Sequence, residues 1–228
     1  MGLKVSKGNM YDWVTHMHSH LAGECPHKCS YCYVQRNKFG VSERYKGEPR
    51  LIESELNENY GTGKTIFIEH MNDLFAEKVK GRWIIAILKH CREYDNDYVF
   101  QTKNPERVYF YYHALPKKSL LGTTIETNRN INNISKAPIP QKRYEYLKKL
   151  RKEGVRVFIT IEPIMDFDVD ILSKWIIDIR PEFINIGADS KGCGLLEPSA
   201  QKILEFINIL NENKINIKKK TNLSRLLQ

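Results

Sequence analysis

The residues best suited to chemistry in this chain of 228 residues are three cysteines that fall within eight consecutive positions. Cys25, Cys29 and Cys32 have the spacing C-x3-C-x2-C, whereas Cys91 and Cys193 lie far along the chain. Thiolates are soft ligands, which select iron–sulfur clusters or zinc over hard cations. A closed site needs a fourth ligand, and no fourth cysteine is close in the sequence. Three thiolates on a cubane cluster leave one iron open, so this loop can present an iron to a small molecule.

A structural zinc site is the alternative interpretation of this loop. Zinc is held by four ligands, and a histidine such as His27, between the first two cysteines, could supply the fourth. Such a site would be closed and would serve folding. The two interpretations therefore differ in whether the metal keeps an open position for a ligand.

Length and composition are those of a single globular domain that covers residues 1–228. The hydrophobic fraction of 41% is enough for a core, and one α/β barrel of this length is ordinary. The formal net charge of +9 is compatible with a polyanionic partner such as nucleic acid. The chain is also rich in Lys, Asn and Ile, a composition that an AT-rich genome would produce by itself. Charge alone therefore does not establish a nucleic-acid partner.

The cysteine usage indicates a reducing compartment, and we expect the protein in the cytoplasm. Three of the five cysteines are clustered, which is typical of metal binding rather than of a disulfide framework. Residues 1–10 are polar and lack the apolar segment of a signal peptide. No stretch approaches the roughly 18 apolar residues of a transmembrane helix, so we expect no membrane partner.

Short apolar runs alternate with longer amphipathic stretches along the chain. The apolar runs predict strands near 13–18 and at 65–69, 98–101, 120–125, 155–161, 183–187 and 215–217. The amphipathic stretches predict helices at 79–94, from 105 towards 113, across 144–150, at 170–180 and across 203–210. Alternating strands and helices imply parallel β/α units. We therefore predict an α/β fold, a partial, open β/α barrel of about six units, closed by a strand at about 215–220.

Polar segments follow the predicted strands at the points where they end: residues 69–75, 101–105, 123–128, 161–163, 187–190 and 220–223. The carboxyl ends of the strands share one face in β/α folds, and functional residues lie there. The cysteine loop, residues 23–34, follows the first strand and so lies at the same face. For any single segment, a helix cap or a loop ion pair is an equally good explanation. Their joint placement favours one shared site.

Taken together, these segments resemble a branch of the radical S-adenosylmethionine (SAM) superfamily near spore photoproduct lyase, made up of phage- and bacterium-encoded proteins of undefined substrate. The resemblance runs from Gly23 to Leu223. It rests on the cysteine loop, with Tyr31 before its last cysteine, and on residues 71–75 (MNDLF), 102–107 (TKNPER), 161–163 (IEP), 187–190 (GADS) and 220–223 (KTNL). The chain departs from the family pattern at His20-Leu21, where members tend to have Asn-Pro, and at Cys193, in a loop that is usually glycine-rich.

The resemblance implies a radical SAM core and its chemistry. Cys25, Cys29 and Cys32 would ligate three irons of a 4Fe–4S cluster, and SAM would occupy the fourth iron. With an electron from a flavodoxin- or ferredoxin-type donor, SAM would be cleaved to methionine and a 5′-deoxyadenosyl radical that abstracts hydrogen from a substrate. Such chemistry belongs to the cofactor, while the protein supplies position and electrostatics. A nucleic acid or nucleotide is the expected substrate, and a small metabolite or a peptide stays open.

The resemblance also gives expected roles to individual side chains. Tyr31 would pack near the adenine of SAM. The other expected SAM contacts are Asn72 and Asp73 to the methionine amino group, Thr124 and Glu126 to the ribose hydroxyls, and Glu162 as a further polar contact. The expected substrate-facing residues are Lys103, Lys220 and Asn222, and the lysine pair would suit a phosphate or a carboxylate. The candidate catalytic residues are Lys103, Lys220 and Cys193, of which Cys193 would be either a hydrogen-atom donor or an inert loop cysteine.

Two other classes of protein stay open. His16, His18 and His20 alternate, so in a strand all three would face one side, and a His-x-His at the end of a first barrel strand also begins metal-dependent hydrolases. Such a hydrolase needs later histidines and an aspartate at strand ends, for which His70 is the one convincing candidate. We expect the alternating histidines to be polar lining beneath the cysteine loop. A nonenzymatic metal- or cluster-containing module that binds nucleic acid is the second alternative.

Overall fold

An eight-stranded sheet forms the centre of the computed structural model, which describes residues 2–6 and 11–228. Its strand order is β1-β2-β5-β6-β7-β8-β9-β10, and every pairing from β2 to β10 is parallel. The strands are β1 (Lys4–Val5), β2 (His16–His18), β5 (Thr65–Ile68), β6 (Asp97–Thr102), β7 (Ser119–Thr124), β8 (Arg156–Ile161), β9 (Ile184–Ile186) and β10 (Ile217–Lys219). β1 is antiparallel to β2, and β1 and β10 are the two edges. The sheet is therefore the open β/α barrel that the sequence predicts.

Position 1 and positions 7–10 lie outside the described residues. These positions belong to the leading segment for which we expect no signal peptide, so that expectation lies in part outside the described residues. In the part of the chain that is described, no helix combines the length and the apolar character needed to cross a membrane.

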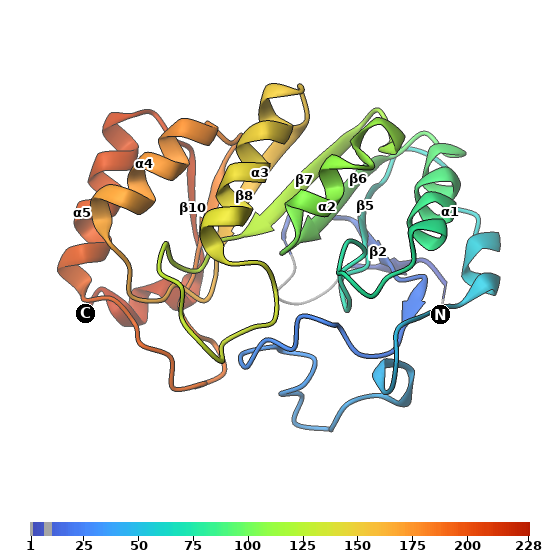
Figure 1. The fold of residues 1–228 in the computed structure, drawn as a ribbon, viewed down its shortest axis with the longest axis horizontal. Helices are drawn as coiled ribbons and strands as arrows, with labels where there is room; N and C mark the ends of the chain where they lie inside the picture. The colour runs from blue at the N-terminus through green and yellow to red at the C-terminus, as the bar shows by residue number, and fades with distance from the viewer. Residues whose placement is uncertain (1, 7–10) are drawn as a thin grey trace.

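The α-helices lie side by side along one side of the curved sheet, in chain order (Figure 1). They are α1 (Gly81–Arg92), α2 (Pro105–Tyr109), α3 (Pro140–Lys152), α4 (Val169–Ile179) and α5 (Ala200–Glu212). The buried face of α5 has the helical spacing i, i+3, i+4, i+7 and is formed by Ile203, Phe206, Ile207 and Leu210. Ser199 caps this helix by accepting a hydrogen bond from the Lys202 backbone N–H.

The crossover between β6 and β7 departs from the prediction at its end. The helix expected to run from Pro105 towards His113 stops at Tyr109, and a 3-10 helix, η3 (Tyr112–Ala114), follows. The start is as predicted, because Pro105 occupies the first turn and the Asn104 side chain caps the helix.

The first crossover, between β2 and β5, carries the cysteine loop. Residues 19–64 are all described, and they contain no α-helix. They form a two-stranded antiparallel sheet and two 3-10 helices: β3 (Leu21–Ala22), β4 (Arg50–Leu51), η1 (Glu43–Tyr45) and η2 (Glu53–Asn57). The first of the six predicted β/α units therefore lacks its helix. Gly23 opens the loop with φ of +87°, and a Cβ there would lie 2.2 Å from the Glu48 carbonyl oxygen, so glycine is required.

Residues 11–14, which precede β2, pack on the inner side of the curved sheet. Tyr11 and Trp13 stack with ring centroids 5.3 Å apart, and Trp13 packs edge-on against Phe158 and Phe183. These two side chains cover a second core, which we call the inner core. It is made of Val14, Phe67, Val99, Leu120, Phe158 and Phe183. Because Trp13 turns into the barrel, β2 begins only at His16, and the predicted strand over 13–18 is too long at its start.

Candidate active site at the carboxyl ends of the strands

A hydrogen-bonded polar layer lies on the inner core of the barrel. The Tyr11 hydroxyl donates to Gln101 Oε1 at 2.8 Å and lies 2.8 Å from Thr160 Oγ1. Gln101 Nε2 donates to Thr124 Oγ1 at 3.1 Å, and Asn185 Nδ2 donates to Thr160 Oγ1 at 3.4 Å. Burial raises the pKa of Tyr11 well above its ordinary value. These side chains come from β6, β7, β8, β9 and the segment before β2, so they form a common floor at the carboxyl ends of the strands.

Sequence reasoning gave most of this floor no role. In β6 and β8, Gln101 and Thr160 each stand two positions after an apolar residue of the inner core, Val99 and Phe158. Side chains of a strand alternate between its two faces, so the inner face changes from apolar to polar towards the carboxyl end. That change is the signal that would have identified Gln101 and Thr160. Tyr11 carries no such signal, because it lies before its strand.

The three predicted metal ligands share the loop that follows β3. Cys25, Cys29 and Cys32 are free thiols, and each is partly exposed. Burial raises the pKa of Cys25 above its ordinary range, and the negative charges of Asp73, Cys29 and Cys32 add to the rise. The charge of each of these two cysteines therefore affects the ionisation of Cys25.

The donor set of this loop is compatible with an iron–sulfur cluster. Three soft thiolates suit iron or zinc. His27, the fourth ligand considered for zinc, has its Nε2 2.7 Å from Asp73 Oδ2, and this contact leaves Nδ1 for a metal, as in carboxylate–histidine–zinc triads. In residues 2–6 and 11–228, no three His, Cys, Asp or Glu side chains converge as the ligands of one metal ion do. The chemistry of these three thiols therefore fits an iron–sulfur cluster, and zinc stays the alternative.

The cysteine loop is held against the β7 loop, which we define as residues 125–139. The Ser30 backbone N–H donates to the Ile134 carbonyl oxygen at 2.9 Å, and the Lys136 backbone N–H donates to the His27 carbonyl oxygen at 2.7 Å. Figure 1 shows the two segments in the lower half of the view, below the helices, the cysteine loop in blue and the β7 loop in yellow-green. Two loops far apart in the sequence thus meet over the ends of the strands.

Asp73, predicted to bind the methionine amino group of SAM, is a buried centre of hydrogen bonds. Its carboxylate contacts His27 Nε2 and Thr102 Oγ1, each at 2.7 Å, and the backbone N–H groups of Lys103 and Phe75 at 2.8 and 2.9 Å. Burial alone would raise the pKa of Asp73, but His27 and the backbone N–H of Lys103 hold it below its ordinary value. Asp73 therefore ties the cysteine loop to the ends of β5 and β6.

Asn72 is attached to the same loop. Its Nδ2 donates to the Gly23 carbonyl oxygen at 3.0 Å, and its Oδ1 accepts from the Asp73 backbone N–H at 2.9 Å. Direct contact of Asn72 and Asp73 with SAM stays a prediction. What the geometry gives is their attachment to the start of the cysteine loop and to its His27.

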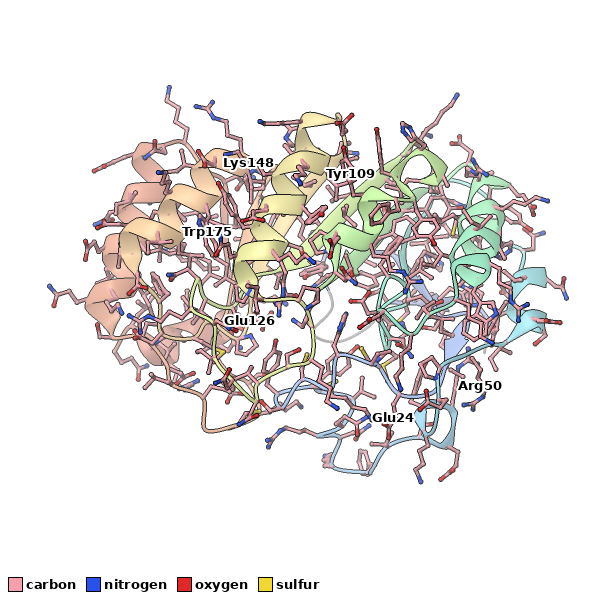
Figure 2. The ribbon with its side chains drawn as sticks, viewed as in Figure 1. Glu24, Arg50, Tyr109, Glu126, Lys148 and Trp175 are labelled. Atoms are coloured by element: carbon pink, nitrogen blue, oxygen red, sulfur yellow. The ribbon has the colours of Figure 1, made fainter. Side chains whose placement is uncertain are left out.

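Three predicted site residues, Glu126, Tyr31 and Lys103, are in contact with one another. Figure 2 shows Glu126 near the lower end of α3, whereas Lys148 lies near the upper end of that helix. The Glu126 carboxylate is 2.9 Å from Lys103 Nζ and 2.7 Å from Arg143 Nη1, and it accepts a hydrogen bond from the Tyr31 hydroxyl. The Lys103 ammonium also lies 5.2 Å from the centre of the Tyr31 ring. Burial would raise the pKa of Glu126, but Arg143 and Lys103 lower it to about 2. We call these four residues the Glu126 group.

A looser polar group lies at the ends of β8, β9 and β10. Lys220 Nζ is 3.5 Å from Glu162 Oε2, and Asn222 Nδ2 is 3.4 Å from Glu162 Oε1. The Glu162 side chain is 24% exposed. Gly187 leaves room for this group, because a Cβ there would lie 2.9 Å from the Glu162 carboxyl group. The structure therefore brings together the predicted residues Glu162, Lys220 and Asn222, around an accessible carboxylate.

Cys193 lies in the loop that follows β9. Its backbone N–H donates to Asp189 Oδ2, and burial together with the Asp189 carboxylate raises the pKa of the Cys193 thiol. A cavity of about 820 Å³ lies between this loop and the 3-10 helix η4 (Thr221–Leu226), and Asp189, Asn222 and Arg225 are among its lining residues. Asn222 thus belongs both to this cavity and to the group around Glu162.

The alternating histidines point away from the barrel interior. His18 pairs with Ile68, which belongs to the core beneath the helices, whereas Met17 packs against the inner core. His18 and His20 join a buried hydrogen-bonded network with Glu55, Tyr60, Glu69 and His90, whereas the ring of His16 contacts Thr15. Burial lowers the pKa of His18 and of His70, the other histidine considered for a hydrolase, to about 4. His18 and His20 are therefore buried polar side chains outside the barrel interior, and a role as lining beneath the cysteine loop stays a prediction.

Comparison with known proteins identifies a family. The family model described as "Protein of unknown function (DUF5131)" matches residues 9–178. No curated protein matches the chain.

Solved structures of low sequence identity share the fold. A double mutant of spore photoproduct lyase with bound AdoMet and dinucleoside spore photoproduct matches with a TM-score of 0.56 at 13% identity, over 92% of this chain and 64% of that chain. SuiB from Streptococcus suis, bound to S-adenosylmethionine, matches with a TM-score of 0.58 at 12% identity, over 90% of this chain and 50% of that chain. The chain thus spans about half to two thirds of the length of these neighbours. Its fold is the partial barrel of radical SAM enzymes.

Proposed function

The chain belongs to the DUF5131 family, and we propose that it is a radical SAM enzyme that uses a 4Fe–4S cluster and SAM to abstract hydrogen from a substrate. The observation that carries the proposal is the three-thiol loop, bonded to Asp73 and to the β7 loop at the carboxyl ends of the strands. The shared fold and the AdoMet bound by two structural neighbours support it.

We assign the cluster to Cys25, Cys29 and Cys32, and SAM to the iron that these thiolates leave open. Bound there, the pair would supply reductive cleavage of SAM, with an electron from a flavodoxin- or ferredoxin-type donor, as the source of the radical that abstracts hydrogen. The chain itself holds the loop in place. His27 on Asp73, and the backbone bonds to the β7 loop, keep the thiols over the strand ends.

The proposed SAM contacts divide according to the partners that each side chain already has. Tyr31 is proposed to pack on the adenine, and Thr124 and Glu162 to offer polar contacts, Glu162 through its accessible carboxylate. Glu126 would act mainly by fixing Tyr31 and Lys103, because its carboxylate already has three donors. In the same way, Asn72 and Asp73 are proposed to act by holding the cysteine loop.

We propose a nucleic acid or nucleotide as the class of substrate. The net charge of +9, Lys103 and Lys220 at the strand ends, and a structural neighbour that carries a dinucleoside support this choice. Asn222 would face the substrate, since it lines the cavity beside η4. Cys193 keeps both of its interpretations, hydrogen-atom donor or inert loop cysteine.

Salt dependence tests the class of substrate. Binding of a short oligonucleotide should weaken steeply as salt rises, because neutralised phosphates release counterions. Lys220→Glu should weaken this binding about tenfold, whereas the matched control Lys148→Glu, on the helix side beside Asp178, should change it little. Binding that ignores salt, or equal effects of the two variants, would point to a small substrate.

Anaerobic reconstitution tests the class of enzyme. The wild-type chain should take up about four irons and four sulfides and, once reduced, should release 5′-deoxyadenosine from SAM. Cys29→Ala should lose both properties, and the matched control Cys193→Ala should keep both. Tight, stoichiometric zinc that iron cannot replace would overturn the proposal. A stable cluster without SAM cleavage would favour a nonenzymatic cluster module.

A further inference from the structure

A hydroxyl group from a distant part of the chain lies against one of the three loop thiols. Ser135, in the β7 loop, has its Oγ 3.2 Å from Cys29 Sγ, although the two residues are 106 positions apart. The contact is partly buried, so bulk water competes with it only in part. It is therefore a contact made by the fold and not by the local sequence of the cysteine loop.

Backbone hydrogen bonds on both sides hold this contact in register. The two residues that flank Ser135 bond to Ser30 and His27, at 2.9 and 2.7 Å, and these partners lie on either side of Cys29. Ser135 Oγ itself accepts from the Ala137 backbone N–H at 3.0 Å. The hydroxyl is thus fixed between two loops that are bonded to each other.

The Ser135 hydroxyl has one proton and two acceptors within reach. The His27 carbonyl oxygen is 3.1 Å from Ser135 Oγ, close to the 3.2 Å that separates Oγ from Cys29 Sγ. A free Cys29 thiol has a proton of its own and can donate it to Ser135 Oγ. A metal-bound thiolate has no proton and can only accept. The His27 carbonyl keeps the Lys136 backbone N–H as a donor if the hydroxyl turns to the sulfur.

We propose that Ser135 donates a hydrogen bond to the Cys29 thiolate of the bound cluster, and that this bond raises the reduction potential of the cluster. The inference rests on the proposed radical SAM function. Reduction adds one electron from an external low-potential donor and breaks no bond in the protein. A hydrogen bond to a ligand sulfur stabilises the reduced state more than the oxidised state, because the reduced state carries the extra negative charge. Ser135 therefore acts through Cys29.

A redox titration followed by electron paramagnetic resonance measures this effect without a substrate. The reconstituted chain is titrated with dithionite and mediators, and spin intensity is scored against iron content. In Ser135→Ala, the ratio of reduced to oxidised cluster at a fixed potential should fall about tenfold, which is about 59 mV for a one-electron couple. Ser173→Ala, which removes a buried hydroxyl from α4, should titrate like the wild type.

An isosteric pair separates the hydroxyl from the shape of the side chain. Ser135→Thr keeps the donor and should titrate like the wild type, whereas Ser135→Val has the shape of threonine without the hydroxyl and should titrate like Ser135→Ala. If the wild type holds a cluster and cleaves SAM but all the variants titrate together, the Ser135 proposal alone is overturned. It is also overturned if the alanine and valine variants take up no cluster while the threonine variant does. A wild-type chain that never binds a cluster overturns both proposals.

Discussion

Glu126 and Glu162 stand at the carboxyl ends of neighbouring strands, β7 and β8, yet their carboxylates are held in opposite ways. Glu126 is 3% exposed and is enclosed by the side chains of Tyr31, Lys103 and Arg143. The side chain of Glu162 is 24% exposed, and its ion-pair partner is 3.5 Å away. One carboxylate is surrounded by donors, and the other is accessible at the strand ends.

This difference indicates what each side of the site contributes. A buried carboxylate whose donors are in place has little capacity left for a ligand, and removing it leaves those donors unsatisfied. Glu126 therefore fixes its neighbours, and the buried Asp73, with four contacts, belongs to the same class. Glu162 can exchange long contacts for the polar groups of a ligand at small cost. The accessible carboxylate is the better candidate for recognition.

The largest expected effect is on stability, from the loss of the enclosed carboxylate. Glu126→Ala leaves Arg143, which is 4% exposed, without its carboxylate, and should lower the free energy of unfolding by about 3–5 kcal/mol. Glu162→Ala, the matched variant, should cost less than about 1 kcal/mol because its ion pair is long and partly exposed. Urea unfolding of the two variants measures both values. Equal losses would remove the distinction between the two carboxylates.

The second effect is a dependence of stability on acid. The pKa of Glu126 is lowered in the folded chain from 4.5 to about 2, which corresponds to roughly 3 kcal/mol of stability. Because the folded pKa is the lower one, this contribution is present above about pH 5 and is lost as the pH falls towards 2. In Glu126→Gln that part of the acid dependence should disappear. Unfolding measured at intervals from pH 6 to pH 2 should show the two chains converging, and parallel profiles would contradict the assignment.

The third effect should appear in SAM binding and not in stability. Glu162→Gln keeps the shape of the side chain but removes its charge, and should weaken SAM binding by about tenfold, or about 1.4 kcal/mol. Equilibrium dialysis of the reconstituted protein measures the affinity, and urea unfolding should stay within about 0.5 kcal/mol of the wild type. Glu205→Gln, at an exposed position of α5, is the control. Unchanged affinity would remove Glu162 from the proposed SAM contacts.

The smallest effect is expected from Cys193→Ala. The three loop thiols already complete the proposed ligand set, so formation of 5′-deoxyadenosine should be unchanged. With the true substrate, loss of the normal product would support the hydrogen-donor interpretation, and an unchanged product would support the inert one. Failure to assemble the cluster would show that Cys193 is itself a ligand.

Local patterns predict most of the elements of the barrel. The apolar runs at 98–101 and 120–125 become β6 (Asp97–Thr102) and β7 (Ser119–Thr124), because a parallel strand that is covered on both faces carries consecutive apolar residues. The strand expected over 13–18 is wrong at its start, where Trp13 packs against Phe158 in β8 and Phe183 just before β9, both far along the chain. A local pattern holds no information about such partners.

The same limit applies to the candidate site. The polar residues after the strands were predicted as a set, since parallel strands bring their carboxyl ends together. Which of them would be enclosed depended on side chains that lie elsewhere, such as Arg143 on α3 for Glu126 and Thr102 for Asp73. The contact between Ser135 and Cys29 is of the same kind, because it depends on how two loops pack.

During synthesis, Tyr11 and Trp13 leave the ribosome long before the residues that will surround them. Their partners include Phe158, Thr160 and Phe183, all in the C-terminal half of the chain. The first two lie in β8, and Phe183 directly precedes β9. Chains usually begin to fold from the N-terminus as they emerge, but contacts between such distant residues form late. Tyr11 and Trp13 therefore lack these packing partners until β8 and β9 have been made. The floor of the site therefore cannot be complete until Asn185 in β9 has been made, although its first residue, Tyr11, is among the earliest to be translated.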